Sequence, residues 1–210
     1  NKQALKLGGL QHTDEQHLLA ELLEARGYTV EFNVIDRLWT SRVTSHIPLR
    51  DVAGTITSGR VTDAVRVIDN GLRQSGIAKP RIAVAGLNPH AGEGGTLGRE
   101  EIDAIGPGIE RAQAEGIDAR GPFPADTVFI AAKRGDFDAV VTMYHDQGQI
   151  AMKLMGFDRG VTVLGGLPVP VTTCAHGTAY DIVGRNVANL VPLANAFELA
   201  VVMAARLSER

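Results

Sequence analysis

The sequence has little of what marks several protein classes. Cys174 is the single cysteine among 210 residues, so no internal disulfide can form, which fits a reducing compartment. Lysine and arginine total 21 against 24 for aspartate and glutamate, so the net charge is −3. This balance lacks the basic excess typical of nucleic-acid or membrane-surface binding. We therefore expect a cytoplasmic protein with no nucleic-acid partner.

Long apolar runs are also missing. The best candidate for a membrane span, residues 190–205, contains Glu198, and its spacing predicts a buried helix instead. We therefore expect no membrane partner. Hydrophobic residues make up 44% of the chain and charged residues 21%, which allows a sizeable core. The length fits one large domain or two small ones.

Helix and strand patterns alternate along the chain. Helical spacing predicts helices over residues 13–26, 61–74, 100–116, 126–133 and 194–208. Short apolar runs predict strands over residues 28–34, 38–45, 81–85, 139–144 and 161–164. Such alternation is typical of a mostly parallel sheet covered by helices on both faces. The predicted fold class is α/β.

Histidines follow three of the predicted strands. His46, His90 and His145 each come shortly after a strand ends. In open α/β sheets ligands bind beyond the carboxyl ends of the strands, so these imidazoles are able to converge there. Three imidazoles bind Zn²⁺ or another divalent first-row ion and leave one coordination position open for substrate. The alternative, three ordinary loop residues bonded to backbone, stays open from the pattern alone.

Other candidate features carry less information. The loop 86–98 is rich in glycine and precedes a helix, which suits an anion, but it is neither a Walker loop nor a Gly-x-Gly-x-x-Gly fingerprint. The loop 174–182 is able to hold a polar ligand or to be an ordinary connection. By pattern alone, Cys174 is typical of a small buried hydrophobic residue and Lys153 of a surface residue.

Several short segments together point to one family. They are 86–95 (GLNPHAGEGG), 124–127 (PADT), 144–148 (YHDQG), 176–179 (HGTA), 46–51 (HIPLRD) and His12-Thr13. These segments closely resemble the 4-hydroxythreonine-4-phosphate dehydrogenase family of vitamin B6 biosynthesis, and the resemblance runs through all 210 residues. That family is related to isocitrate and isopropylmalate dehydrogenases. The resemblance therefore implies their two-domain architecture and a homodimer with its active site at the interface.

The resemblance also implies roles for individual positions. His46, His90 and His145 match the family's metal ligands. The positions matching substrate-holding or acidic residues near the metal are His12, Thr13, Lys153, Asp126, Asp146 and Thr162. Those matching the loop around the adenine side of NAD are His176, Gly177, Thr178, Ala179 and Asp181.

The activity implied is metal-dependent, NAD- or NADP-linked oxidation of a 3-hydroxy acid, followed by decarboxylation of the resulting β-keto acid. Zn²⁺ is the first choice of metal, with Co²⁺, Mn²⁺ or Mg²⁺ as alternatives. We predict that Lys153, together with Asp146, transfers the proton, because a partly desolvated lysine beside a cation loses its proton more easily. Asp126 is a further acidic candidate for the catalytic group.

Two features depart from the family pattern. Thr162 and Val171 stand where members acting on the phosphorylated amino acid carry Asn and Arg, and valine cannot replace a bidentate guanidinium. This favours other hydroxy acids, such as phosphorylated four-carbon sugar acids or aromatic cis-dihydrodiol carboxylates. A metal-dependent hydrolase or aldolase and a non-catalytic fragment are the alternatives.

The second departure concerns length and domain organisation. The family's chains begin with a further segment, so we expect the front part to be missing from this chain. Residues 1–170 would then form the sheet with the metal and substrate region. Residues 171–210 would form the nucleotide loop and the closing helix.

Overall fold

The computed structural model describes residues 2–12 and 15–208. Its α-helices are α1 (Lys2–Leu7), α2 (Glu15–Leu22), α3 (Leu49–Thr55), α4 (Ser58–Gln74), α5 (Gly106–Ala114), α6 (Val128–Arg134), α7 (His145–Gly156) and α8 (Val191–Leu207). Short 3₁₀-helical segments are η1 (Pro89–Gly95), η3 (Phe157–Arg159) and η4 (Tyr180–Ile182), and η2 (Glu101–Ile105) is a short π-helix. Its strands are β1 (Val30–Ile35), β2 (Leu38–Arg42), β3 (Arg81–Ala85), β4 (Asp118–Phe123), β5 (Ala139–Thr142), β6 (Val161–Gly165) and β7 (Thr172–Cys174).

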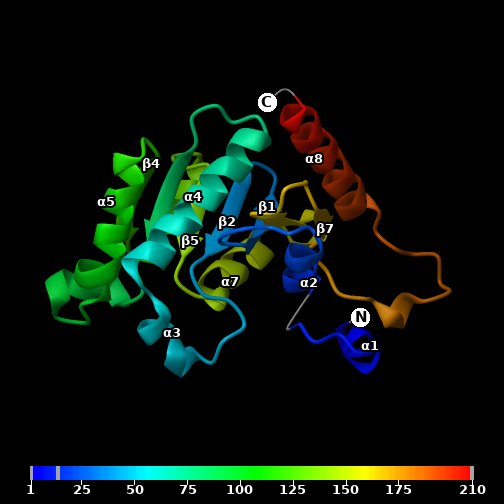
Figure 1. The fold of residues 1–210 in the computed structure, drawn as a ribbon, viewed down its shortest axis with the longest axis horizontal. Coiled ribbons are helices and arrows are strands. Elements are labelled where there is room, and N and C mark those ends of the chain that lie inside the picture. Colours follow the sequence, from blue (N-terminus) through cyan, green and yellow to red (C-terminus); the bar gives the residue numbers. More distant parts are fainter. Residues whose placement is uncertain (1, 13–14, 209–210) are drawn as a thin grey trace.

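The seven strands form one mixed sheet in the order β4-β3-β5-β2-β1-β6-β7. The pairs β4–β3, β3–β5 and β5–β2 are parallel, whereas β2–β1, β1–β6 and β6–β7 are antiparallel. Strands β4, β3, β5, β2 and β6 therefore share one direction, and β1 and β7 run the other way. Figure 1 shows β4 and α5 at one side of the molecule and β7 and α8 at the other.

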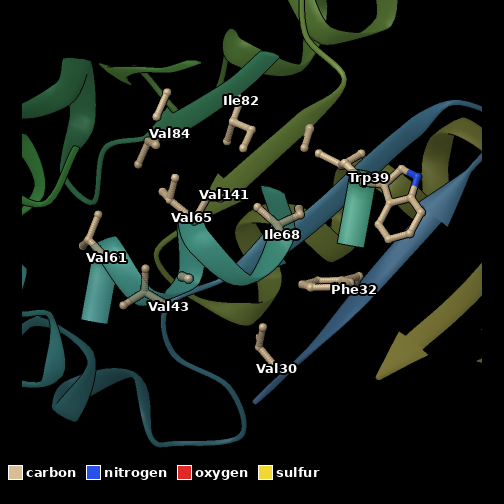
Figure 2. Packing of buried hydrophobic residues seen from close by; sticks show 14 of the residues in the cluster. Val30, Phe32, Trp39, Val43, Val61, Val65, Ile68, Ile82, Val84 and Val141 are labelled. Atoms are coloured by element: carbon tan, nitrogen blue, oxygen red, sulfur yellow. The ribbon is translucent and has the colours of Figure 1, made fainter. Parts of the chain in front are cut away.

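One face of the sheet is covered by α4, with α5 and α8 beside it. Alternate strand residues point to this face because side chains in a strand have a period of two. The buried hydrophobic cluster on this face includes Ile82 and Val84 of β3 and Val141 of β5, together with Val65 and Ile68 of α4 (Figure 2). These five side chains are fully buried, so this layer forms the main core.

The other face is covered by α6 and α7. The intervening strand residues, Ala83, Ala85 and Val140, point to this side and pack with Phe129 of α6 and Met152 of α7. Because both faces of β3 and β5 are covered, their sequences are almost continuously apolar, as in parallel sheets generally. The centre of the sheet is thus sealed from water on both sides.

The antiparallel half of the sheet is organised around one aromatic ring. Phe32 of β1 is 1% exposed and lies 5.7 Å from the ring of Trp39, measured between centroids. A Cβ at Gly71 of α4 would lie 2.8 Å from the Phe32 ring, and one at Gly165 of β6 would lie 2.2 Å from it. Glycine at both positions therefore leaves room for the ring between helix and sheet.

Most elements lie where the sequence predicts them, and the α/β fold class is confirmed. The predicted strand 81–85 has the observed bounds, whereas the predicted helix 100–116 divides into η2 and α5. Helices α1, α3 and α7 and strands β4 and β7 were not predicted. Strand β4 contains Gly121-Pro122, residues that usually interrupt strands, and lies at the edge of the sheet where proline is tolerated.

Residues 190–205 are predicted to form a buried helix. The structure has a helix there, but the predicted burial is wrong. Helix α8 buries only Pro192, Ala196 and Met203, whereas Leu193 and Phe197 are 58% and 69% exposed. The helix packs on β6, β7 and α4 with one side only. One side of this mainly apolar helix is therefore left uncovered.

None of the helices in the described part of the chain has the length and apolar character needed to cross a bilayer. The division of the chain near residue 170 stays a prediction. On the described residues, β7 pairs with β6, and α8 packs against both strands, so the segment after residue 170 adds to the same sheet.

Candidate functional site

The predicted metal ligands follow three adjacent parallel strands. β3, β5 and β2 are neighbours in the sheet and point the same way, so their carboxyl ends share one edge. His145 begins α7 directly beyond β5, His46 follows β2, and His90 lies in η1 beyond β3. The topology thus places all three histidines beyond the edge where α/β sheets bind ligands.

Two of these imidazoles face one another. The ring centroids of His46 and His145 lie 5.6 Å apart, with the ring planes inclined by 42°. They line a hollow of about 320 Å³ together with Thr44, Ser45, Tyr144 and Asp146. Two imidazoles that bind one Zn²⁺ at about 2.0–2.1 Å place their ring centres roughly 5 Å apart. The separation of the pair therefore suits a shared divalent ion.

Asp146 orients the His145 ring. Its Oδ1 lies 2.6 Å from His145 Nδ1. An ionised carboxylate only accepts hydrogen bonds, so beside it Nδ1 is the donor and Nε2 is the ring atom left to bind a metal. A carboxylate behind a histidine in this way is the usual arrangement behind metal-binding imidazoles. The position of Asp146 directly after His145 in the segment YHDQG thus has a physical explanation.

His90 does not join this pair. Among the residues that the structure describes, no three histidine, cysteine, aspartate or glutamate side chains form a group suited to a metal. His90 is exposed on η1, where its backbone has a left-handed φ of 54°. The structure therefore brings two of the three predicted ligands together, and the three-histidine set stays a prediction.

Gln147 ties the His145 turn to the His90 loop. Its Oε1 accepts a hydrogen bond of 2.8 Å from the backbone N–H of Met143, and its Nε2 donates one of 3.0 Å to the carbonyl of Gly86. Gly86 is the first residue after β3. One amide side chain thus fixes the spacing between two of the loops that carry histidine.

Lys153 and Thr162 lie beside a polar network inside the antiparallel half of the sheet. Asn33 Oδ1 accepts from Arg42 Nη1 at 3.0 Å and from Gln149 Nε2 at 2.5 Å, and Asn33 Nδ2 donates to Thr162 Oγ1 at 3.3 Å. Lys153, one turn beyond Gln149 on α7, is exposed and borders a small cavity with Asn33 and Gln149. The network thus brings Thr162 and Gln149 together through Asn33.

The guanidinium of Arg42 is the buried charge of this network. Arg42 is 3% exposed and also contacts Glu31 and the Ser45 hydroxyl. Sequence reasoning missed it, because an arginine at the end of a strand is usually solvated. The same is true of Asn33, whose amide connects three elements.

The remaining substrate candidates lie apart from the histidine pair. His12 Nε2 lies 2.9 Å from the Glu21 carboxylate, and Asp126 is exposed in the turn between β4 and α6. Neither residue lines the hollow at His46 and His145. Thr13 lies outside the described residues. The roles predicted for these residues stay predictions.

The segment after β7 surrounds a second, larger hollow. Its volume is about 890 Å³, and its walls include His176, Gly177, Thr178, Ala179, Ile182, Val183, Val187 and Pro192. Asp181 is not among the lining residues, and its carbonyl accepts a hydrogen bond from Arg185. The hollow has the size and the mainly apolar wall that suit a large organic ligand such as a nucleotide.

Comparison with known proteins identifies one family. The family of the pyridoxal phosphate biosynthetic protein PdxA matches residues 1–200. The chain belongs to the PdxA family. The resemblance found in the sequence motifs is thereby confirmed.

The PdxA relatives are longer than this chain. "Putative 4-hydroxythreonine-4-phosphate dehydrogenase 2" of Pseudomonas aeruginosa is 57% identical over 203 residues, which are 95% of this chain and 60% of that protein. D-threonate 4-phosphate dehydrogenase of Salmonella typhimurium is 44% identical over 204 residues, which are 97% of this chain and 62% of that protein. The chain therefore spans about three fifths of the length of these relatives.

Solved structures agree with the PdxA assignment. A 4-hydroxythreonine-4-phosphate dehydrogenase from Klebsiella pneumoniae superposes with a TM-score of 0.84 at 41% identity, over 97% of this chain and 62% of that one. A terephthalate 1,2-cis-dihydrodiol dehydrogenase from Burkholderia xenovorans gives 0.73 at 29% identity, over 92% and 61%. A β-decarboxylating dehydrogenase from Thermococcus kodakarensis gives 0.58 at 16% identity, over 91% and 63%, and supports the fold alone.

Proposed function

We propose that this chain carries the metal and nucleotide sites of a dehydrogenase that oxidises a 3-hydroxy acid with NAD or NADP and decarboxylates the product. The observation that carries the proposal is the pair of imidazoles at His46 and His145, 5.6 Å apart beyond adjacent parallel strands. Their separation and donor type suit a divalent ion. The dehydrogenase names of several PdxA relatives support the reaction class.

His46 and His145 would hold the metal, with His90 as the third ligand. Zn²⁺ suits this donor set best, and Co²⁺, Mn²⁺ or Mg²⁺ are alternatives. When bound, the ion supplies Lewis-acid polarisation of a substrate oxygen. The resemblance implies a homodimer with the site at its interface, so the three imidazoles need not come from one chain.

Lys153 would transfer the proton, assisted by Asp146 and with Asp126 as a further acidic candidate. Lys153 and His145 stand on the same helix, two turns apart, so α7 carries both a metal ligand and a proton-transfer group. Thr162 and the pair His12-Thr13 would hold the substrate. The Thr162 hydroxyl accepts a hydrogen bond from Asn33, which leaves its own proton free to donate to a substrate oxygen.

The substrate class we favour is a phosphorylated four-carbon hydroxy acid. Several relatives are named for D-threonate 4-phosphate and others for 4-hydroxythreonine 4-phosphate. Thr162 and Val171 in place of an amide and a guanidinium favour the sugar acid over the amino acid. An aromatic cis-dihydrodiol carboxylate is the alternative, because the corresponding Burkholderia xenovorans enzyme superposes well but is less identical.

The hollow at residues 176–192 would bind the nucleotide. His176, Gly177, Thr178 and Ala179 line it, whereas Asp181 stands beside it. A nicotinamide nucleotide bound there supplies the hydride acceptor. We also propose a cytoplasmic location, because a single cysteine fits a reducing compartment.

The proposal is tested with a panel of 3-hydroxy acids, phosphorylated and aromatic, each supplied with NAD or NADP and with Zn²⁺, Co²⁺, Mn²⁺ or Mg²⁺. NADH or NADPH formation is followed by absorbance. We expect turnover that disappears after chelation and returns with the metal. A protein that binds the metal but no nucleotide would favour a hydrolase or aldolase. A protein that binds neither the metal nor the nucleotide would indicate a non-catalytic fragment.

A further inference from the structure

The turn that carries His90 has an unusual backbone. His90, Ala91, Gly92, Glu93 and Gly94 all have positive φ, at 54°, 51°, 82°, 44° and 64°. Three of the five carry a Cβ, which makes the left-handed region unfavourable, and left-handed residues normally occur singly. A left-handed turn of this length therefore needs support from the surrounding structure.

The carboxylate of Glu101 provides contacts at the start of this turn. Glu101 is 4% exposed. Its Oε1 accepts hydrogen bonds from the backbone N–H groups of Leu87 and Asn88, at 2.7 and 2.8 Å, and its Oε2 accepts one of 2.9 Å from Asn88 Nδ2. Three donors thus converge on one buried anion immediately before the left-handed residues.

The middle and the end of the loop pack on the same groups. A Cβ at Gly92 would lie 2.6 Å from Glu101 Oε2, and one at Gly98 would lie 2.3 Å from Asn88 Nδ2. Both glycines have positive φ, at 82° and 134°, so backbone geometry and space select glycine together. The loop therefore packs on the Glu101 carboxylate at its start and middle, and on the Asn88 amide bound to that carboxylate at its end.

A carboxylate suits this position better than an amide. The Asn88 amide is a donor, so a glutamine at 101 would turn an NH₂ group toward another NH₂ group or give up a backbone bond. Burial alone raises the pKa of Glu101, but the hydrogen bonds from Asn88 and Leu87 outweigh burial and lower the pKa below its ordinary value. The group is thus ionised at neutral pH.

We propose that Glu101 is a positioning residue, whose buried carboxylate holds the left-handed turn and thereby presents the His90 imidazole to the metal. The part of this inference that concerns the metal rests on the proposed function. The part that concerns the turn does not. Gln147 completes the arrangement, since it anchors Gly86, at the start of the same loop, to the turn that carries His145.

The experiment compares the full chain with Glu101→Gln and with Glu100→Gln as the matched control. Glu100 contacts Asn88 Nδ2 at 2.7 Å, but no backbone N–H bond to it is found among the described residues. Hydrogen exchange measured by mass spectrometry on residues 86–98 should become faster in Glu101→Gln by about tenfold or more, with α4 and β3 unchanged. Glu100→Gln should leave exchange near that of the original chain.

Co²⁺ binding, followed by visible absorption, tests the link to His90. Glu101→Gln should weaken Co²⁺ binding by roughly tenfold, which lies within the range found when a residue that orients a metal ligand is mutated. The double variant Glu101→Gln/His90→Ala should bind no more weakly than His90→Ala alone. Additive losses would overturn the assignment, because Glu101 would then act independently of His90.

Two other outcomes also overturn the inference. One is unchanged exchange at residues 86–98 in Glu101→Gln, and the other is faster exchange over the whole chain, which would indicate general destabilisation. If Glu101→Gln does not fold, Gly92→Ala replaces it, because the added Cβ would displace the turn while the carboxylate is kept. Absence of Co²⁺ binding in every protein would refute the proposed function and leave the exchange result valid.

Discussion

The parallel half of the sheet and the segment 176–190 are built in opposite ways. In the parallel half, Ile82, Val84 and Val141 are fully buried, and side chains such as Glu101 and Gln147 fasten the following loops to the backbone. In residues 176–190 every residue except Ile182 is exposed. The loops with the metal-ligand candidates are thus held by the protein itself, whereas the segment 176–190 has little packing of its own. We expect that segment to gain order from what binds to it.

A matched pair of phenylalanines gives the largest expected difference between the regions. Phe32→Ala removes a ring that is 1% exposed and should lower the free energy of unfolding by about 3–5 kcal/mol. Phe197→Ala on α8, where the residue is 69% exposed, should change it by about 0.5 kcal/mol or less. Urea denaturation followed by circular dichroism measures both. Equal losses would show that the exposed face of α8 is covered in solution.

Two histidine variants separate the proposed metal site from the proposed nucleotide site. His46→Ala removes one of the paired imidazoles and should weaken Zn²⁺ binding by about 100-fold or more, because loss of a ligand exceeds the roughly 10–100-fold effect of losing an orienting partner. His176→Ala should leave Zn²⁺ binding unchanged. Calorimetric titration of chelator-treated protein gives both affinities. A loss with His176→Ala alone would place the metal in the other region.

Two valine variants test the nucleotide hollow. Val187→Asp puts a carboxylate into the apolar wall and should weaken NAD binding by about tenfold, because an unpaired charge is unfavourable against an apolar ligand surface and near phosphates. Val202→Asp makes the same change on α8, away from the lining residues, and should leave NAD binding as it is. Fluorescence or calorimetric titration with NAD distinguishes them. Equal affinities would exclude this hollow as the nucleotide site.

The smallest expected effect is the response of stability to acid. Burial raises the pKa of Asp138, but hydrogen bonds from the side chain and backbone N–H of Arg81 outweigh burial and lower it. Because the folded pKa is lowered, the stabilisation is present above the ordinary pKa of about 4 and is lost as pH falls below it. Asp138→Asn should flatten the stability curve between about pH 5 and 3. Asp181→Asn makes the same substitution in the exposed segment and is the matched control.

Local patterns were sufficient for much of the architecture. The run Arg81–Ala85 is apolar because both of its faces are covered, so it was recognisable as a strand of a parallel sheet. Helix α7 was missed, because His145, Asp146 and Gly148 at its start resemble a loop. Its helical state depends on packing against β1, β2 and β5.

The candidate site was predictable in residue type and less so in geometry. His46, His90 and His145 were identifiable because each follows a strand, and strand direction places such residues at one edge. Glu101 and its neighbour Glu100 cannot be told apart in sequence, although one is buried under three hydrogen bonds. Arg42 likewise resembles a surface residue until its partners on β1 are known.

Amino-acid order alone was enough to specify most of the strands and helices and the chemical character of the loops, because hydrophobic periodicity and chain direction act over a few neighbouring residues. The packing of distant segments decided three further features: which imidazoles lie together, which carboxylate is buried and which apolar helix keeps an uncovered side. Those features arise from contacts between residues far apart in the chain. Their energies depend on burial and on three-dimensional distance, which no short stretch of sequence contains.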